Sequence, residues 1–237
     1  MKYLLAVAAA LLCPVGADAA AYVEINAGQT LGTAEAVGPA GVTVDTITGT
    51  LSALQDADLF RIYIMTPSTF SATTLNAGTN DATLDTALFL FDSAGRAVAT
   101  NDDDAGGLSL QATLPVGNAF YAGLTAGYYY LGIGNSGNEP VNLNNQLLFA
   151  RDPNGGTTAV RGPAGGVTPV ALFDFDSNAY DGNGAGAYRI VLTGVTTGPG
   201  TPGGVPEPAS WAMMIAGFGV IGGSLRRRSA AVGFRLA

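Results

Sequence analysis

The feature that most constrains the fold of this chain is the lack of any helix-forming stretch between residues 21 and 206. No segment of useful length in this span repeats its apolar residues with a helical period. Instead, short runs of apolar, β-branched and aromatic residues alternate with clusters of Gly, Asn, Asp and Pro, which favour turns. This pattern predicts an all-β domain, an antiparallel β-sandwich or jelly roll.

Eight segments of the chain carry the strand pattern. The strongest are residues 58–65, 84–91, 128–133 and 187–192, and the others are 44–51, 69–75, 109–114 and 146–150. Side chains alternate between the two faces of a strand, so Phe60, Ile62 and Ile64 share one face. We expect these three residues to be buried with Leu88 and Leu90, and Asp85 and Asp92 to lie at or near strand ends.

Residues 1–20 are predicted to form a secretory signal peptide with a short helix. Lys2 precedes an apolar run over residues 4–12, and small residues suited to signal peptidase follow at 17–19 or at 19–21. The apolar run is too short to stay in a membrane as a span. Cys13 follows two bulky leucines, which favours an ordinary leader residue over the alternative of a lipid-anchored cysteine.

Residues 206–237 differ from the rest of the chain. Pro206, Glu207 and Pro208 form a stretch that disfavours helix, because each Pro biases its predecessor away from the helical region. Residues 211–225, which begin with Trp211, carry no charge and would span about 22 Å as a helix. Arg226, Arg227 and Arg228 follow and are typical of the cytoplasmic end of a membrane anchor. The segment predicts a hydrophobic anchor helix, with a marginal amphipathic tail as the alternative.

This tail resembles the PEP-CTERM sorting signal of Gram-negative bacteria, in the variant with Trp-Ala soon after Pro-Glu-Pro. The resemblance implies transient anchoring in the inner membrane, processing by exosortase near Pro-Glu-Pro, and delivery to the cell surface or exopolysaccharide matrix. Signal peptidase would process the other end, and exopolysaccharide is a candidate partner. The chain departs from the usual pattern in the nine residues that follow the arginines.

Between the two signals we expect a β-sandwich over residues 21–195 and a linker rich in Gly, Pro and Thr over residues 196–205. Residues 21–205 contain five arginines and no lysine against sixteen acidic residues, a formal charge of −11. Such a surface repels nucleic acid and anionic lipid, so we expect no nucleic-acid partner.

Part of this body is similar to bacterial pre-peptidase C-terminal domains, which are β-sandwich modules of secreted proteases and of non-enzymatic surface proteins. The similarity covers about residues 45–135, and its motifs are residues 55–60, 85–95, 101–104 and 126–131. No protease domain accompanies them, and an insertion around residues 140–180 interrupts the usual closing segment.

The residue types exclude several classes of enzyme. The chain has no His, and its only Lys and only Cys lie in the predicted leader. Triads that depend on His, sites with His or thiolate metal ligands, and Schiff-base lysines are therefore excluded. Glu24, Glu35 and Glu139 stand in polar surroundings, unlike the apolar setting that raises the pKa of a glycosidase acid. We expect no enzymatic activity. For the function, an accessory domain of a secreted hydrolase system is an alternative.

The most prominent group of acidic residues comprises Asp102, Asp103 and Asp104, together with Asp85 and Asp92. Adjacent carboxylates repel one another, and calcium, which prefers six to eight oxygen ligands, would relieve that repulsion. Some members of the similar family bind calcium in such loops. Calcium is therefore a candidate ligand here, and a solvated acidic loop is the alternative.

Two weaker sequence patterns are further candidates for ligand binding. Residues 174–181 open like a calcium loop, but they lack the Gly and Glu that an EF-hand needs at positions 6 and 12. Tyr128, Tyr129 and Tyr130 could form a sugar-stacking platform, although strand alternation puts at most two on one face. The sequence thus predicts an exported, non-catalytic surface or matrix protein, with a glycan-binding adhesion module and a calcium-dependent folding module as alternatives.

Overall fold

The computed structural model describes residues 20–39, 41–74, 84–107, 109–150, 158–165, 170–176 and 184–199. This part of the chain is all-β, as predicted, and its only helical element is the 3₁₀ turn η1 (Pro67–Thr69). It belongs to the first of two units, residues 1–199 and 200–237. The predicted signal helix, linker end and anchor helix lie outside the described residues, among which no helix is long and apolar enough to cross a membrane.

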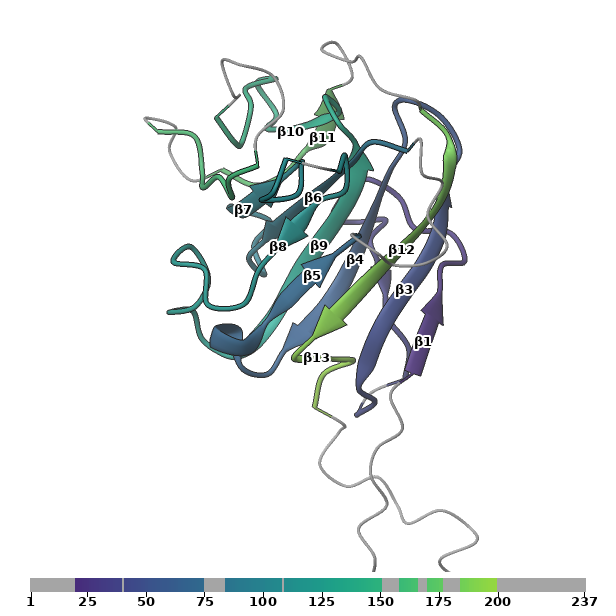
Figure 1. Ribbon diagram of the computed structural model, residues 1–237, viewed down its shortest axis with the longest axis vertical. Coiled ribbons are helices and arrows are strands. Elements are labelled where there is room, and N and C mark those ends of the chain that lie inside the picture. Colours follow the sequence, from purple (N-terminus) through teal and green to yellow (C-terminus); the bar gives the residue numbers. More distant parts are fainter. Residues whose placement is uncertain are drawn as a thin grey trace, which may run out of the picture. The chain divides into compact units, whose positions relative to one another are not determined.

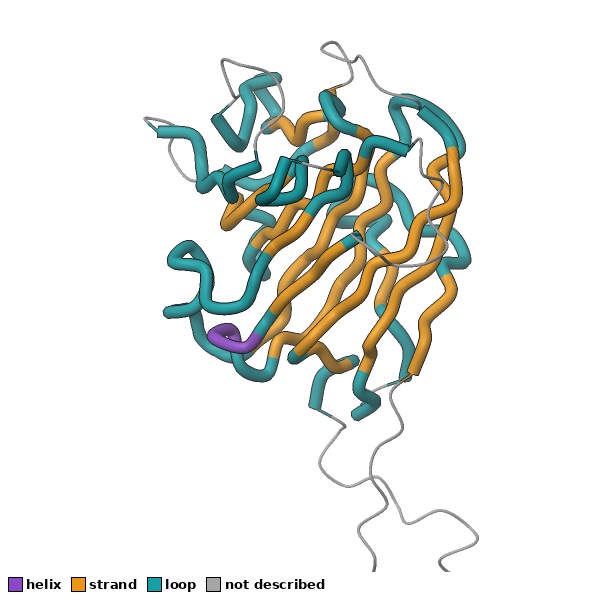
Figure 2. The backbone as a smooth tube through the Cα atoms, in the orientation of Figure 1, coloured by secondary structure: helices purple, strands orange, loops and turns teal. Residues whose placement is uncertain are grey.

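Two main sheets form the body (Figures 1 and 2). The first sheet has the order β1 (Ala20–Val23), β3 (Val44–Leu51), β12 (Gly186–Thr193), β5 (Ser71–Thr73) and β8 (Thr113–Leu114). The second has the order β13 (Val195–Thr196), β4 (Ala57–Ile64), β9 (Gly127–Asn135), β6 (Thr86–Phe91) and β7 (Ala97–Asn101), and β2 (Glu35–Ala36) also pairs with β4. A separate ribbon joins β10 (Glu139–Val141) to β11 (Asp174–Asp176). Neighbours pair antiparallel, except that β1 with β3 and β2 with β4 are parallel.

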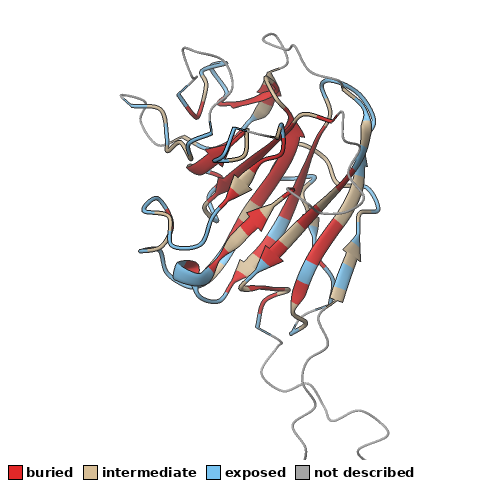
Figure 3. Ribbon diagram, in the orientation of Figure 1, coloured by how far each residue is buried: buried red, intermediate tan, exposed pale blue. Residues whose placement is uncertain are grey.

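The main core lies between the two sheets, and Figure 3 shows its buried residues as red segments of the strands. The predicted face of β4 and β6 is confirmed, because the five residues expected there are at most 1% exposed: Phe60, Ile62, Ile64, Leu88 and Leu90. Ile47 of β3 and Ile190 of β12 belong to the same core from the first sheet. Alternation along each strand thus fixes which side chains enter the core.

A second core lies on the outer face of the second sheet. Residues 139–150, 158–165 and 170–176, here called the cover, contribute Phe149 and Phe175, which contact Phe89 of β6. The ring centroids of Phe89 and Phe175 lie 5.5 Å apart, with the rings at 72°. The cover explains why every residue of β6 is buried: one face of the strand meets the first sheet and the other meets the cover.

The structure corrects several predicted strands. Residues 146–150 form no strand, because Leu147 and Phe149 make only single bridges, to Val141 and Pro163. Of residues 109–114 only the last two are a strand, and of residues 69–74 only Ser71–Thr73 are one, as β5, while residue 75 lies outside the described residues. Within the part of the chain that the structure describes, six strands were not predicted: β1, β2, β7, β10, β11 and β13.

Strand β1 begins inside the predicted leader, at its last residue. The backbone N–H of Ala20 donates to the carbonyl of Thr43 at 2.9 Å, and β1 pairs with β3 from Ala20 onward. Cleavage after residue 21 would remove two of the four residues of β1, whereas cleavage after residue 19 leaves the strand whole. Of the two predicted cleavage positions, only the one after residue 19 leaves β1 whole, and it would start the domain one residue before the predicted boundary.

Candidate functional site

The structure brings Asp85 and Asp102 to the same end of the second sheet. The strands β6 and β7 run antiparallel, so the end of β7 returns to the start of β6. Ser136 links the two residues, because its N–H donates to the carbonyl of Asp85 at 2.9 Å and its hydroxyl donates to Asp102 Oδ2 at 3.0 Å. Asp103 and Asp104 follow in the next turn and are partly exposed.

Asp92 lies at the opposite end of β6, in the turn that joins β6 to β7. Its Oδ1 accepts the backbone N–H groups of Ala94 at 2.8 Å and Arg96 at 2.9 Å. The six residues of β6 separate Asp92 from Asp85 by about 20 Å, so the two cannot share an ion. Among the described residues, no group of three or more acidic side chains could hold a metal ion. The structure therefore gives the predicted calcium site no support.

Burial governs the titration of the Asp102 carboxyl, which is only 7% exposed. Loss of hydration, together with the charges of Asp103 and Glu139, raises the pKa of Asp102 to about 6, against the lowering effects of Ser136 and Arg161. Its Oδ1 is buried and has no hydrogen-bond partner among the described residues. Burial also raises the pKa of Asp103.

The residues of the two weaker sequence patterns, the 174–181 loop and the three tyrosines at 128–130, make contacts within the fold. Asp174 lies in β11 and accepts a hydrogen bond from Gln29 Nε2 at 2.6 Å, while residues 177–183 of that loop lie outside the described residues. Tyr129 points into the main core and Tyr128 lies on the outer face, as alternation predicts. The Tyr128 ring is already contacted by Tyr63, at 5.1 Å between centroids, and by the Arg61 guanidinium at 4.8 Å.

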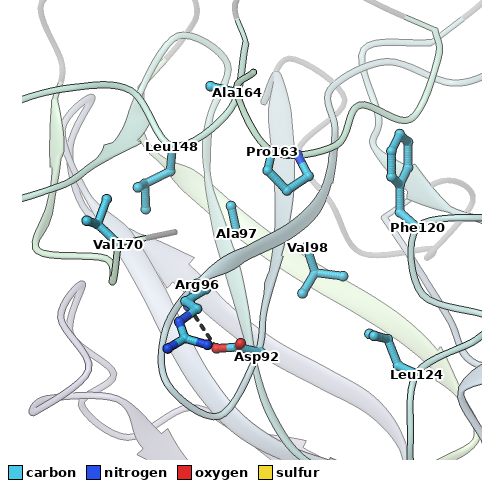
Figure 4. A pocket seen from close by; sticks show the side chains of 10 residues that line it. All are labelled: Asp92, Arg96, Ala97, Val98, Phe120, Leu124, Leu148, Pro163, Ala164 and Val170. Carbon is cyan, nitrogen blue, oxygen red and sulfur yellow. Dashed lines mark hydrogen bonds between the residues drawn. The ribbon is translucent and has the colours of Figure 1, made fainter. Parts of the chain in front are cut away.

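A pocket of about 360 Å³ lies along the edge strand β7 (Figure 4). Its lining is mainly apolar and comes from the β6–β7 turn, the loop before β9 and the cover. The lining residues are Asp92, Arg96, Ala97, Val98, Phe120, Leu124, Leu148, Pro163, Ala164 and Val170. Figure 4 shows Asp92 and Arg96 together at one end of the pocket, away from Phe120 and Ala164.

The sequence analysis missed this pocket. Only its turn, with Asp92 and Gly95, carries a recognisable sequence signal. Phe120 stays 45% exposed and packs against Gly162, where a side chain would collide with the ring. The walls come from segments far apart in sequence, so no local spacing could have indicated that they meet.

A buried polar pair, also missed, connects the two sheets. Tyr188 of β12 donates its hydroxyl to Asp58 Oδ2 of β4 at 2.6 Å, and the two residues are 1% and 3% exposed. Burial raises the pKa of Asp58 to about 7, helped by the nearby charges of Asp56, Glu24 and Glu35 and opposed by the Tyr188 hydrogen bond. Burial and the neighbouring Asp58 also raise the pKa of Tyr188.

Comparison with known proteins identifies one segment of the chain. Residues 204–228 match the PEP-CTERM protein-sorting motif. The match contains the residues predicted for sorting: Pro206, Glu207, Pro208, Trp211, Arg226, Arg227 and Arg228. These residues lie outside the part that the structure describes.

No curated protein matches the chain, and the similarity of its body to pre-peptidase C-terminal domains stays a prediction. The sorting motif implies export and processing at the membrane by exosortase. The chain therefore carries a PEP-CTERM protein-sorting motif at residues 204–228, which supports sorting by exosortase.

Proposed function

We propose that the protein is a non-catalytic component of the cell surface or exopolysaccharide matrix and that it binds neutral polysaccharide there. The observation that carries this proposal is the sorting motif at residues 204–228, which supports export to the surface. The β7 pocket adds a concave, largely apolar site with a few polar groups at one end, the usual construction of a small-ligand site.

The placement of the carboxyl groups supports binding over catalysis. Glycoside hydrolysis needs two carboxyl groups on either side of one bond. The pocket lining contains only one acidic residue, Asp92. Asp58, whose pKa is raised, lies enclosed between the sheets, and Asp102 lies at the other end of β6.

The negative charge of the body favours a neutral ligand over a polyanion. Residues 21–205 carry a formal charge of −11, so the body repels polyanions. Two alternative functions would share this binding of a neutral polysaccharide. One is an adhesion module that binds a host or neighbour glycan, and the other is an accessory domain that brings a hydrolase to its polymer. We do not propose calcium binding, because the described residues contain no group of acidic side chains suited to a metal.

Co-sedimentation tests the proposal. The processed protein, purified from outside the producing cells, is mixed with neutral and acidic fractions of the polysaccharide of that bacterium. We expect it to sediment with the neutral fraction and to release no new reducing ends. Failure to bind any fraction would contradict the proposal, and release of reducing ends would contradict its non-catalytic part.

A further inference from the structure

We propose that the β7 pocket binds a single neutral sugar ring through one apolar face and adjacent hydroxyl groups. This inference rests on the proposed function and adds the site and the chemistry of recognition. Three features of the pocket carry it: an exposed aromatic wall, a polar pair at one end, and an edge strand that is already bridged at both ends.

The aromatic wall is Phe120. Phe120 remains 45% exposed, and one side of its ring packs against Gly162. Val98 and Leu148 are buried and form apolar surface deeper in the pocket. An exposed ring beside buried aliphatic side chains offers a flat apolar surface, which matches the C–H face of a pyranose.

The polar pair is Asp92 with Arg96. The backbone N–H groups of Ala94 and Arg96 occupy Asp92 Oδ1, and no described residue donates to Oδ2. The carboxylate is thus fixed in the turn with acceptor capacity left over.

Arg96 differs from the other arginines that the structure describes. Arg61 lies over Tyr128, Arg161 lies 3.8 Å from Glu139, and Arg189 is also engaged. The guanidinium of Arg96 has no partner among the described residues and is exposed at the pocket. An acceptor and a donor side by side suit two neighbouring hydroxyl groups, and their opposite charges give no preference for an ionic ligand.

A peptide strand fits the same place less well. Strand addition needs a free edge along which several backbone groups can pair. The outer edge of β7 is bridged at both ends, by Thr100 to Arg161 and by Arg96 to Ala171. Only residues 97–99 lie between these bridges, too few for a stable added strand.

Binding of pocket variants to the neutral polysaccharide tests the inference. Phe120→Ala removes the aromatic wall and Arg96→Gln removes the charged donor on the exposed turn. Phe173→Ala is the matched control, because Phe173 is 52% exposed on the cover and does not line the pocket. We expect each pocket variant to bind about tenfold more weakly and the control to stay within about twofold of the wild type. Neutral monosaccharides from complete hydrolysis of the polymer should compete with it for the wild type.

The outcomes separate the two proposals. If the wild type binds and both pocket variants bind as tightly as Phe173→Ala, the site is wrong while the proposed function stands. Failure of the monosaccharides to compete would overturn recognition of a single ring. If the wild type binds no polysaccharide, the proposed function fails and the site fails with it. Should Phe120→Ala not fold, as melting would show, Arg96→Gln decides the question.

Discussion

Replacing Asp58 with Asn is expected to remove most of the pH dependence of unfolding between about pH 4 and pH 7. The Asp58 carboxyl has a pKa of about 7 in the folded protein, against 3.8 as its ordinary value. In this range the folded state binds a proton that the unfolded state has released. The stabilisation is therefore complete below about pH 4 and is lost as the pH rises through 7. Three pKa units correspond to at most about 4 kcal/mol.

Urea unfolding at a series of pH values measures this effect. The wild type should lose free energy of unfolding across the range, and Asp58→Asn should show a flatter profile because its amide cannot ionise. Asp102, whose pKa is raised to about 6, adds a smaller slope of the same sign in both proteins. Asp45→Asn is the control, since Asp45 is exposed on β3. Parallel profiles for the wild type and Asp58→Asn would show that Asp58 titrates as an ordinary carboxyl.

Truncation of Phe60 should have the largest effect on stability. Phe60 is fully buried between the sheets, and Phe60→Ala removes its transfer free energy and leaves a cavity. We expect a loss of about 3–5 kcal/mol in the free energy of unfolding by denaturant. A loss below about 1 kcal/mol would mean that Phe60 does not face the core.

Phe175→Ala provides a comparison within the second core. It removes the ring that packs on Phe89 and should loosen the cover while leaving the two main sheets intact. Hydrogen exchange should then speed up at the amides of Leu148 and Leu172, which bond Pro140 and Gly95, and should stay slow along β4 and β9.

The sequence predicted those parts of the fold that carry a regular pattern. The long strands β3, β4, β9 and β12 contain stretches of alternating residues, such as Phe60, Ile62 and Ile64 in β4, and the inward faces of these stretches follow from that period. Strands of two or three residues, such as β2 and β13, have no period to detect.

The cover and the candidate site were harder to foresee for a different reason. The burial of β6 on both faces was visible as an apolar run, but the sequence does not say which segment covers the outer face. The separation of Asp85 from Asp92 follows from the strand between them and could have been predicted. The pair Asp58 and Tyr188, 130 residues apart, depends on how the sheets stack, which no local pattern reports.

Intact-mass measurement of the protein recovered from outside the producing cells tests the central claim, that the chain is exported and sorted through its PEP-CTERM motif. The account predicts a chain that begins at Ala20, because this start leaves β1 whole, and that ends near Pro206 to Pro208. The hydrophobic segment 211–225 and the arginines after it should be missing. An external protein that still carries residues 226–237 would contradict the claim.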